Sequence, residues 1–125
     1  HILIRKKSYC MNAKIADSVR VLHILDAIAE IEQYIQGVDK DTFCNNSMMF
    51  NATLHQLEII GEAANGLSED FIINHPDAPW ARIIGLRNVI IHEYFGVDDL
   101  TIWSIITINI PQLKQYLSDK NNTTK

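Results

Sequence analysis

The sequence predicts an all-α protein, an antiparallel four-helix bundle with a short fifth helix after Pro111. Apolar residues recur every three or four positions along four segments, which is the period of a helix packed on one side. The chain has only 5 Gly and 3 Pro among its 125 residues, and it shows no alternation typical of strands. This length is enough for one domain with its own core. We therefore expect a single domain over residues 1–125, with residues 1–12 and 119–125 as flexible tails.

The first two helices are predicted before residue 68. The first runs from Ile15 to Ile35, with its apolar residues at Val21, Ile24, Leu25, Ile28, Ile31 and Ile35, and Gly37 ends it. The second is capped by Asp39 or Asp41 and continues to about Leu67. Its apolar stripe consists of Phe50, Leu54, Leu57, Ile60, Ala64 and Leu67. The small residues in that stretch, Gly61, Ala63 and Ala64, leave room for a neighbouring helix.

The second half of the chain is predicted to contain a connection and two further helices. Residues 68–79 form the connection, because two X-Pro steps disfavour helix before each proline. A third helix extends from Trp80 to about Tyr94, with Pro79 at its first position. A fourth, capped by Asp98 or Asp99, reaches Ile110, where Pro111 kinks it or starts a new turn.

Composition narrows the class of protein. Apolar residues make up 47% of the chain, charged residues 21%, and the formal net charge is −4. An acidic chain argues against a protein that coats nucleic acid, because coating requires many Lys and Arg residues. An active site that cuts RNA needs only a local cationic pocket, so this function is not excluded. The two cysteines, Cys10 and Cys44, are expected to be free thiols in a reducing compartment. No apolar run is long enough for a membrane span, and no signal peptide is recognisable, so we expect a cytoplasmic protein without a membrane partner.

One polar cluster is predicted on the third helix. At about 100° per residue, Arg87 and Tyr94 share one side of the helix, and Asn88 and His92 share the adjacent side. The opposite side carries Leu86, Val89 and Ile90 and should face the core. Taken alone, such spacings also arise on helices without a catalytic role.

These residue types suit the cleavage of an RNA phosphodiester. RNA supplies its own nucleophile, the 2′-hydroxyl, so cleavage needs a base, an acid and a cation at phosphorus, but no metal and no cofactor. Histidine is the side chain that ordinarily changes charge near neutral pH, so His92 can carry either proton. Arg87 can hold phosphate with a forked guanidinium, Tyr94 can donate a hydrogen bond, and Asn88 can orient its neighbours.

The same arc also predicts a partner surface. Ile84 and Ile91 lie among the polar groups, and apolar residues on an outer face often contact a second chain. One histidine per chain is awkward for acid and base together, whereas two chains sharing a cleft supply two. We therefore expect a homodimer whose interface passes beside Arg87 and His92.

The other histidines fit simpler roles. His55, Glu58 and Glu62 share a helix face, which could suggest a metal site, but the paired Glu-x-x-His elements of di-iron bundles are missing from the sequence. A polar face is the favoured interpretation, with Glu62 as a candidate support for Arg87. His23 lies among apolar residues and is assigned a structural role, and His75 is assigned to a turn.

Several segments together resemble the HepT toxins, a branch of the HEPN superfamily. Arg87, His92 and Tyr94 match the R-x4-H-x-Y motif of that family. The similarity extends from about Ala13 to Leu117 and includes residues 27–35, 60–64, 75–80, 83–97 and 103–117.

The resemblance implies a HEPN-like fold and a specific activity. It implies a homodimeric, metal-independent endoribonuclease, with Arg87 and His92 in the catalytic roles and the two motifs meeting in one cleft. It also implies a partner, an MntA-type minimal nucleotidyltransferase antitoxin of a type VII toxin–antitoxin system. That partner transfers AMP to the motif tyrosine, here Tyr94, and silences the toxin.

Two other functions remain open at this point. The chain could be a non-catalytic helical partner of a nucleotidyltransferase, or a purely structural interaction protein. The intact set of Arg87, His92 and Tyr94 favours the ribonuclease, because a scaffold has no need of those three groups.

Overall fold

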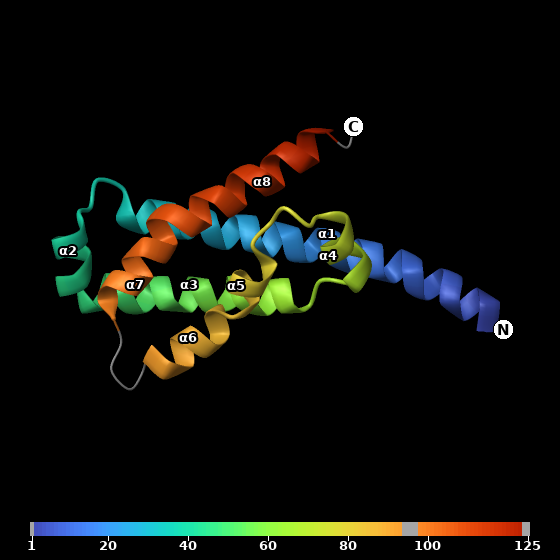
Figure 1. Ribbon diagram of the computed structural model, residues 1–125, viewed down its shortest axis with the longest axis horizontal. Coiled ribbons are helices and arrows are strands. Elements are labelled where there is room, and N and C mark those ends of the chain that lie inside the picture. Colours follow the sequence, from blue (N-terminus) through green and yellow to red (C-terminus); the bar gives the residue numbers. More distant parts are fainter. Residues whose placement is uncertain (1, 94–97, 124–125) are drawn as a thin grey trace.

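The computed structural model describes residues 2–93 and 98–123, and it describes side chains within residues 14–88, at Ile90, and within residues 98–119. Every regular element in these ranges is helical, which confirms the all-α class (Figure 1). In place of the four expected helices and the short fifth one, the same ranges contain eight α-helices and one π-helix. The simple four-helix antiparallel arrangement is therefore not confirmed.

The first helix, α1, spans Ile2–Ile35. It buries the predicted apolar face, with Val21, Ile24, Ile28 and Ile31 at most 7% exposed. The helix begins at Ile2 rather than near Ile15, so its backbone includes most of the segment expected as a tail. It ends before Gly37, whose φ of 70° lies in the left-handed region that favours glycine.

The predicted second helix is two helices, α2 (Lys40–Asn45) and α3 (Ser47–Asn65). Asn46 interrupts it with extended backbone angles, and its side chain accepts a hydrogen bond from the Met49 amide at 3.0 Å. Asp39, rather than Asp41, caps α2 by accepting from the Thr42 amide at 2.8 Å. Cys44 on α2 is a half-buried free thiol. Burial and then the charge of Asp99 raise the pKa of that thiol.

A short helix, α4 (Glu69–Asn74), lies where only a connection was expected. Ser68 caps it by accepting from the Phe71 amide at 3.1 Å. The buried carboxylate of Asp17 on α1 accepts from the Ser68 amide at 2.8 Å and from the Ser68 hydroxyl at 2.6 Å. The helix ends at His75, as the following proline predicts, and the His75 carbonyl accepts from the Trp80 indole at 2.7 Å.

The predicted third helix is also divided, into α5 (Trp80–Ile84) and α6 (Leu86–Glu93). Gly85 separates them, with φ −69° and ψ −10°. Pro79 occupies the cap position before α5 and not its first turn. The buried Ile83 and Leu86 lie on either side of the glycine, so both short helices pack against the same core.

The last segment comprises α7 (Asp99–Ser104), a π-helix (Ile105–Asn109) and α8 (Ile110–Thr123). Asp98 caps α7 by accepting from the Leu100 amide at 3.2 Å. The π-helix ends two residues before Pro111, so the helix is distorted close to where the proline was expected to kink it. The fifth helix predicted after Pro111 corresponds to α8, which starts one residue before the proline. The backbone of α8 includes most of residues 119–125, which were expected to be a tail.

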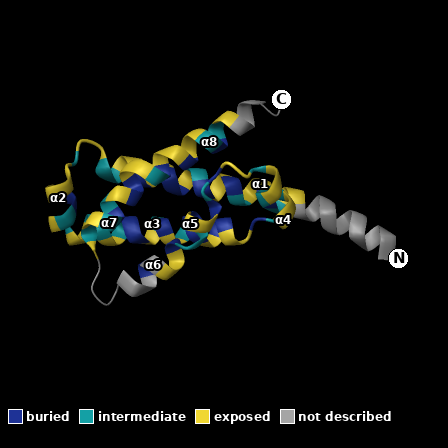
Figure 2. Ribbon diagram, in the orientation of Figure 1, coloured by how far each residue is buried: buried dark blue, intermediate teal, exposed yellow. Residues whose placement is uncertain are grey.

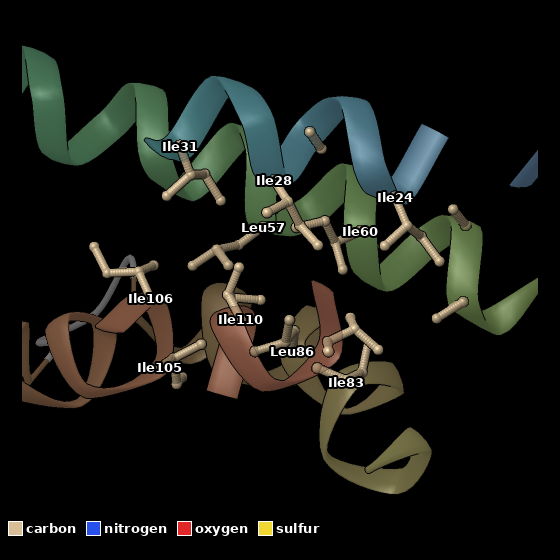
Figure 3. Packing of buried hydrophobic residues seen from close by; sticks show 14 of the residues in the cluster. Ile24, Ile28, Ile31, Leu57, Ile60, Ile83, Leu86, Ile105, Ile106 and Ile110 are labelled. Carbon is tan, nitrogen blue, oxygen red and sulfur yellow. The ribbon is translucent and has the colours of Figure 1, made fainter. Parts of the chain in front are cut away.

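The core lies between the α1–α3 pair and the second half of the chain. Helices α1 and α3 run side by side in opposite directions, as Figure 1 shows. Their buried residues, including Ile28 and Leu57, point toward Leu86 and Ile110 on the other side (Figure 3). Figure 2 shows that buried positions on α1 and α3 face inward while exposed positions face outward. Among the described residues, no helix is long and apolar enough to cross a membrane.

Candidate active site

Helix α6 places the polar cluster on the outside of the bundle. Leu86 and Ile90 are only 1% and 2% exposed, so one side of α6 faces the core as predicted. Arg87 and Asn88 lie on the exposed side. The amide of Asn88 donates to the Gly85 carbonyl at 3.1 Å, which fixes the first turn of the helix. The backbone thus presents Arg87 to solvent from a short, anchored element.

Gly61 on α3 allows α6 to approach closely. A Cβ atom at Gly61 would lie 3.5 Å from the Arg87 backbone nitrogen and 3.6 Å from the Leu86 Cβ atom. These are ordinary van der Waals distances, so the glycine lies directly against the backbone that carries Arg87. The close helix approach expected at this glycine is confirmed. The main chain of Arg87 is consequently positioned by α3.

Glu62, the next residue on α3, forms an ion pair with Arg87. The Arg87 Nη1 atom lies 3.2 Å from the Glu62 Oε1 atom. The two side chains are 58% and 49% exposed, so the guanidinium remains accessible to a phosphate. A guanidinium has five N–H donors, and holding one side of it with a carboxylate restricts its orientation. Glu62 therefore lies where a support for Arg87 was predicted.

The other predicted site residues are placed less completely. Asn88 is adjacent to Arg87 and exposed. The backbone of His92 belongs to α6, about 7.5 Å further along the helix axis than Arg87, but its side chain is not among those described. Ile91 has a described backbone only, and Tyr94 lies outside the described residues. The structure thus pairs Arg87 with Glu62 and leaves Asn88 exposed beside Arg87, while the catalytic roles of Arg87, His92 and Tyr94 stay predictions.

A groove between α1 and α3 begins at the same carboxylate. Its volume is about 610 Å³, and its lining includes Arg20, His23, His55, Glu58, Ile59 and Glu62. His23 is exposed here, so its assignment to a structural role was wrong. The sequence of α1 contains a signal for this surface that the analysis of its buried face overlooked. Ile15, Val19 and Leu22 are apolar but lie on the side of α1 that faces away from the core.

The polar face that was predicted on α3 is present in the structure. His55, Glu58 and Glu62 line the groove together. In the part of the chain whose side chains are described, no three His, Cys, Asp or Glu residues are grouped so that they could hold a metal ion. His75 follows the last residue of α4 and begins the connection to α5, which agrees with its assignment to a turn, and its ring stacks on Phe71 with centroids 4.0 Å apart.

Replacing Glu62 with glutamine tests what the ion pair does. Because both partners are about half exposed, we expect the free energy of unfolding to change by no more than about 1 kcal/mol. If the site cuts RNA, cleavage should fall several-fold, since the carboxylate that orients the Arg87 guanidinium is removed. Urea unfolding followed by circular dichroism measures the first quantity, and initial rates with a labelled RNA measure the second. A larger loss of stability would show that Glu62 is mainly structural.

Comparison with known proteins identifies a family model that fits this arrangement. The model described as "Ribonuclease HepT-like" matches residues 24–119, which include Glu62, Arg87, His92 and Tyr94. The matched range covers α3, α6 and most of α8, together with the C-terminal third of α1.

Individual relatives support the same assignment. A Methanocaldococcus jannaschii protein named "Putative RNase MJ1380" is 37% identical over 92 residues, covering 74% of this chain and 84% of that protein. A Thermococcus cleftensis protein named "Probable ribonuclease HepT" is 38% identical over 92 residues, covering 73% and 83%. A similarly named Caldanaerobacter subterraneus protein is 35% identical over 97 residues, covering 78% and 87%. No solved structure gives a significant match.

Proposed function

Because this chain belongs to the HepT-like ribonuclease family, we propose that it is the metal-independent endoribonuclease toxin of a type VII toxin–antitoxin system. The observation that supports the site most directly is Arg87, an exposed guanidinium paired with Glu62 on the helix that also carries His92. We place the protein in the cytoplasm, where its RNA substrates are.

The proposed reaction uses the substrate's own hydroxyl group. A base, assigned to His92, removes the proton from the ribose 2′-hydroxyl, whose oxygen then attacks the adjacent phosphorus. The new bond joins phosphorus to the 2′-oxygen, and the bond to the 5′-oxygen of the next nucleotide breaks. A proton from an acid goes to that leaving oxygen, leaving a 2′,3′-cyclic phosphate and a 5′-hydroxyl. Arg87 stabilises the negative charge that grows on the phosphate oxygens.

The need for both an acid and a base supports a homodimer. Each motif contains one histidine, and a single imidazole cannot be deprotonated and protonated at the same moment. Two chains with their α6 helices facing one cleft would supply a base from one copy and an acid from the other. Asn88, exposed beside Arg87, is assigned to orient these groups.

Regulation is assigned to Tyr94, two residues after His92. The proposed partner is an MntA-type nucleotidyltransferase, which would join the α-phosphate of ATP to the tyrosine oxygen and release pyrophosphate. The added nucleotide would bring negative charge and bulk beside Arg87, and both oppose the binding of an RNA backbone. Before modification, the Tyr94 hydroxyl is also assigned a supporting role in the site, where it can donate a hydrogen bond.

Chelation and end-group analysis test the cleavage chemistry. The purified chain is incubated with a mixed RNA in EDTA, and we expect cleavage at an unchanged rate with 2′,3′-cyclic phosphate ends. Loss of cleavage in EDTA with recovery in Mg²⁺ would contradict the metal-independent mechanism. Growth arrest on expression that persists unchanged in His92→Ala would instead favour the non-catalytic binding partner.

A mass measurement tests the regulation separately. The chain is expressed alone and beside an active nucleotidyltransferase, and its intact mass and Tyr94-containing peptide are compared. AMP on Tyr94 only in the second sample is expected. An unmodified Tyr94 in the presence of an active partner and ATP would contradict control by AMP transfer and would move regulation to complex formation.

A further inference from the structure

A second arginine, Arg20 on α1, lies against the end of α3. A Cβ atom at Gly66, the residue that follows α3, would overlap with the Arg20 Nε atom and would lie 2.9 Å from the Arg20 Cζ atom. The guanidinium therefore covers the glycine directly. Gly66 has a φ of −87°, which any residue can adopt, so its backbone angles do not require glycine. The close approach of Arg20 accounts for the glycine instead.

The position of Arg20 is fixed through its own helix. Asp17, three residues earlier on the same side of α1, accepts hydrogen bonds from the Ser68 amide at 2.8 Å and from the Ser68 hydroxyl at 2.6 Å. Ser68 follows Gly66 by two residues, so these bonds tie α1 to the end of α3 at the level of Arg20. The Asp17 carboxylate is buried, so water and salt weaken this connection little.

The guanidinium of Arg20 has donors to spare. Among the residues whose side chains are described, no carboxylate forms an ion pair with Arg20, and no hydrogen bond engages it. A cation is favourable at the C-terminal end of a helix, so one effect of Arg20 is to stabilise α3. That effect leaves its five N–H donors available. Arg20 is half-buried and lines the groove between α1 and α3, where a ligand can reach these donors.

Arg20 and Arg87 contact α3 one helical turn apart. Arg87 pairs with Glu62, and Arg20 lies on Gly66, four residues later on the same side of α3. Four residues span about 6 Å along a helix axis. This spacing is similar to the step from one phosphate to the next in an RNA strand. Glu58 lies one turn before Glu62, so the direction from Arg87 to Arg20 leads away from a carboxylate that would repel RNA.

We propose that Arg20 binds the phosphate next to the one that is cleaved, so that Arg87 and Arg20 hold consecutive phosphates of one RNA strand. The inference rests on the proposed function, because it takes the phosphate at Arg87 as the one that is cleaved. Arg20 is then a substrate-binding residue and takes no part in the proton transfers. Among the described lysines and arginines, Arg20 is the one that lines the groove together with Glu62.

Substrates with one and two phosphates test the proposal. Cleavage by the wild type and by Arg20→Gln is measured with a dinucleoside monophosphate and with two trinucleotides. The trinucleotides add one phosphate on the 5′ or the 3′ side, and a 2′-deoxyribose prevents cleavage at the added phosphate. For one trinucleotide we expect Arg20→Gln to lower kcat/KM at least tenfold more than for the dinucleotide, mainly through a higher KM.

Lys40→Gln is the matched control for this experiment. It removes an exposed cation from α2, away from the groove, and should affect all three substrates equally. An equal effect of Arg20→Gln on all three substrates would overturn the proposal.

The salt dependence of RNA binding tests the same contact without cleavage. An RNA strand with 2′-deoxyribose at the cleaved position supplies no nucleophile, so its binding is measured at equilibrium by fluorescence anisotropy. Each phosphate contact that is lost lowers the slope of log K against log salt by about 0.7 for a single strand. We expect this decrease in Arg20→Gln and no change in Lys40→Gln. An unchanged slope in Arg20→Gln would contradict the contact.

Gly66→Ala displaces Arg20 without removing it. The new methyl group occupies the place of the guanidinium, whereas the backbone angles of Gly66 suit alanine, so the fold should be retained. We expect this variant to lose trinucleotide cleavage as Arg20→Gln does. In an Arg20→Gln background, Gly66→Ala should cause no further loss. Additive losses would show that Gly66 acts independently of Arg20 and would count against the proposal.

The outcomes separate this inference from the proposed function. If the wild type cuts RNA and Arg20→Gln treats all substrates as the wild type does, the ribonuclease stands and the role of Arg20 is wrong. If the wild type binds RNA without cutting it, and Arg20→Gln lowers the salt slope, the phosphate contact stands and the ribonuclease is wrong. Unchanged RNA binding with weaker association of a protein partner would assign Arg20 to that partner and overturn the proposal.

Discussion

Replacing Arg87 with alanine is expected to slow RNA cleavage by about 100-fold or more, since the growing phosphate charge loses its fixed cation. Alanine at His92 should cost a similar factor, in the range of roughly 10² to 10⁴ that general acid–base groups contribute. Arg87→Lys should recover only part of the rate, because an ammonium keeps the charge but not the forked geometry. Initial rates with a labelled RNA oligonucleotide give all three values.

Arg82→Ala is the matched control for the arginine variant. Arg82 is an exposed arginine on α5, five residues before Arg87 in the sequence, and it has no part in the proposed site. Its loss should leave the cleavage rate within about twofold, and both variants should keep the helical spectrum of the wild type. Equal rate losses in Arg82→Ala and Arg87→Ala would show that surface charge, and not a specific site, accounts for the effect.

Replacing Phe43 with alanine is expected to lower the free energy of unfolding by about 3–5 kcal/mol. Phe43 is fully buried on α2, and its ring lies 5.7 Å from that of Phe50 and 5.3 Å from that of Trp103. Its removal leaves a cavity where α2, α3 and α7 meet, and short helices cannot easily close such a cavity. Urea unfolding at one fixed protein concentration measures the change without a contribution from a shifted association equilibrium.

Met48→Ala provides the comparison on the neighbouring helix. Met48 is 79% exposed, so its truncation should change the free energy of unfolding by less than about 0.5 kcal/mol. If Phe43→Ala were to cost no more than about 1 kcal/mol, this corner of the fold would not depend on aromatic packing.

Much of the helical content could be predicted from the sequence because its signals are periodic. The spacing of Ile24, Ile28 and Ile31 identifies the buried side of α1 without reference to any other segment. The breaks at Asn46 and Gly85 were harder to predict, because neither residue disrupts the apolar period on its two sides. Asn46 ends α2, where its amide donates to the Phe43 carbonyl at 3.3 Å, and it caps α3 with its own side chain.

The helix α4 lies where sequence signals for a connection and for a helix start compete. The connection was predicted from two X-Pro steps, which do end α4 at His75. The start signal was overlooked, although Ser68 followed by Glu69 and Asp70 is a typical capped first turn. The bond between Ser68 and Asp17 could not be predicted, because it joins residues 51 positions apart.

The residues of the candidate site could be predicted where they belong to a recognisable sequence motif. Arg87 and its exposure followed from helical spacing, and the pairing with Glu62 agreed with the context of Gly61 and the residues after it. The groove was not foreseen, since it depends on which sides of α1 and α3 face each other. Spacing within one helix contains no information about the side chains of another.

Glu62 couples two surfaces thermodynamically, because its side chain belongs to both. Its carboxylate pairs with Arg87 and also lines the groove, so any chain that occupies the groove changes the environment of the guanidinium that is proposed to bind RNA. Linkage requires that such an effect be reciprocal: if a second copy tightens RNA binding by some factor, RNA tightens the association of the two copies by the same factor. The concentration of toxin and the abundance of RNA would then act on one equilibrium, and the protein would respond to both through a single side chain.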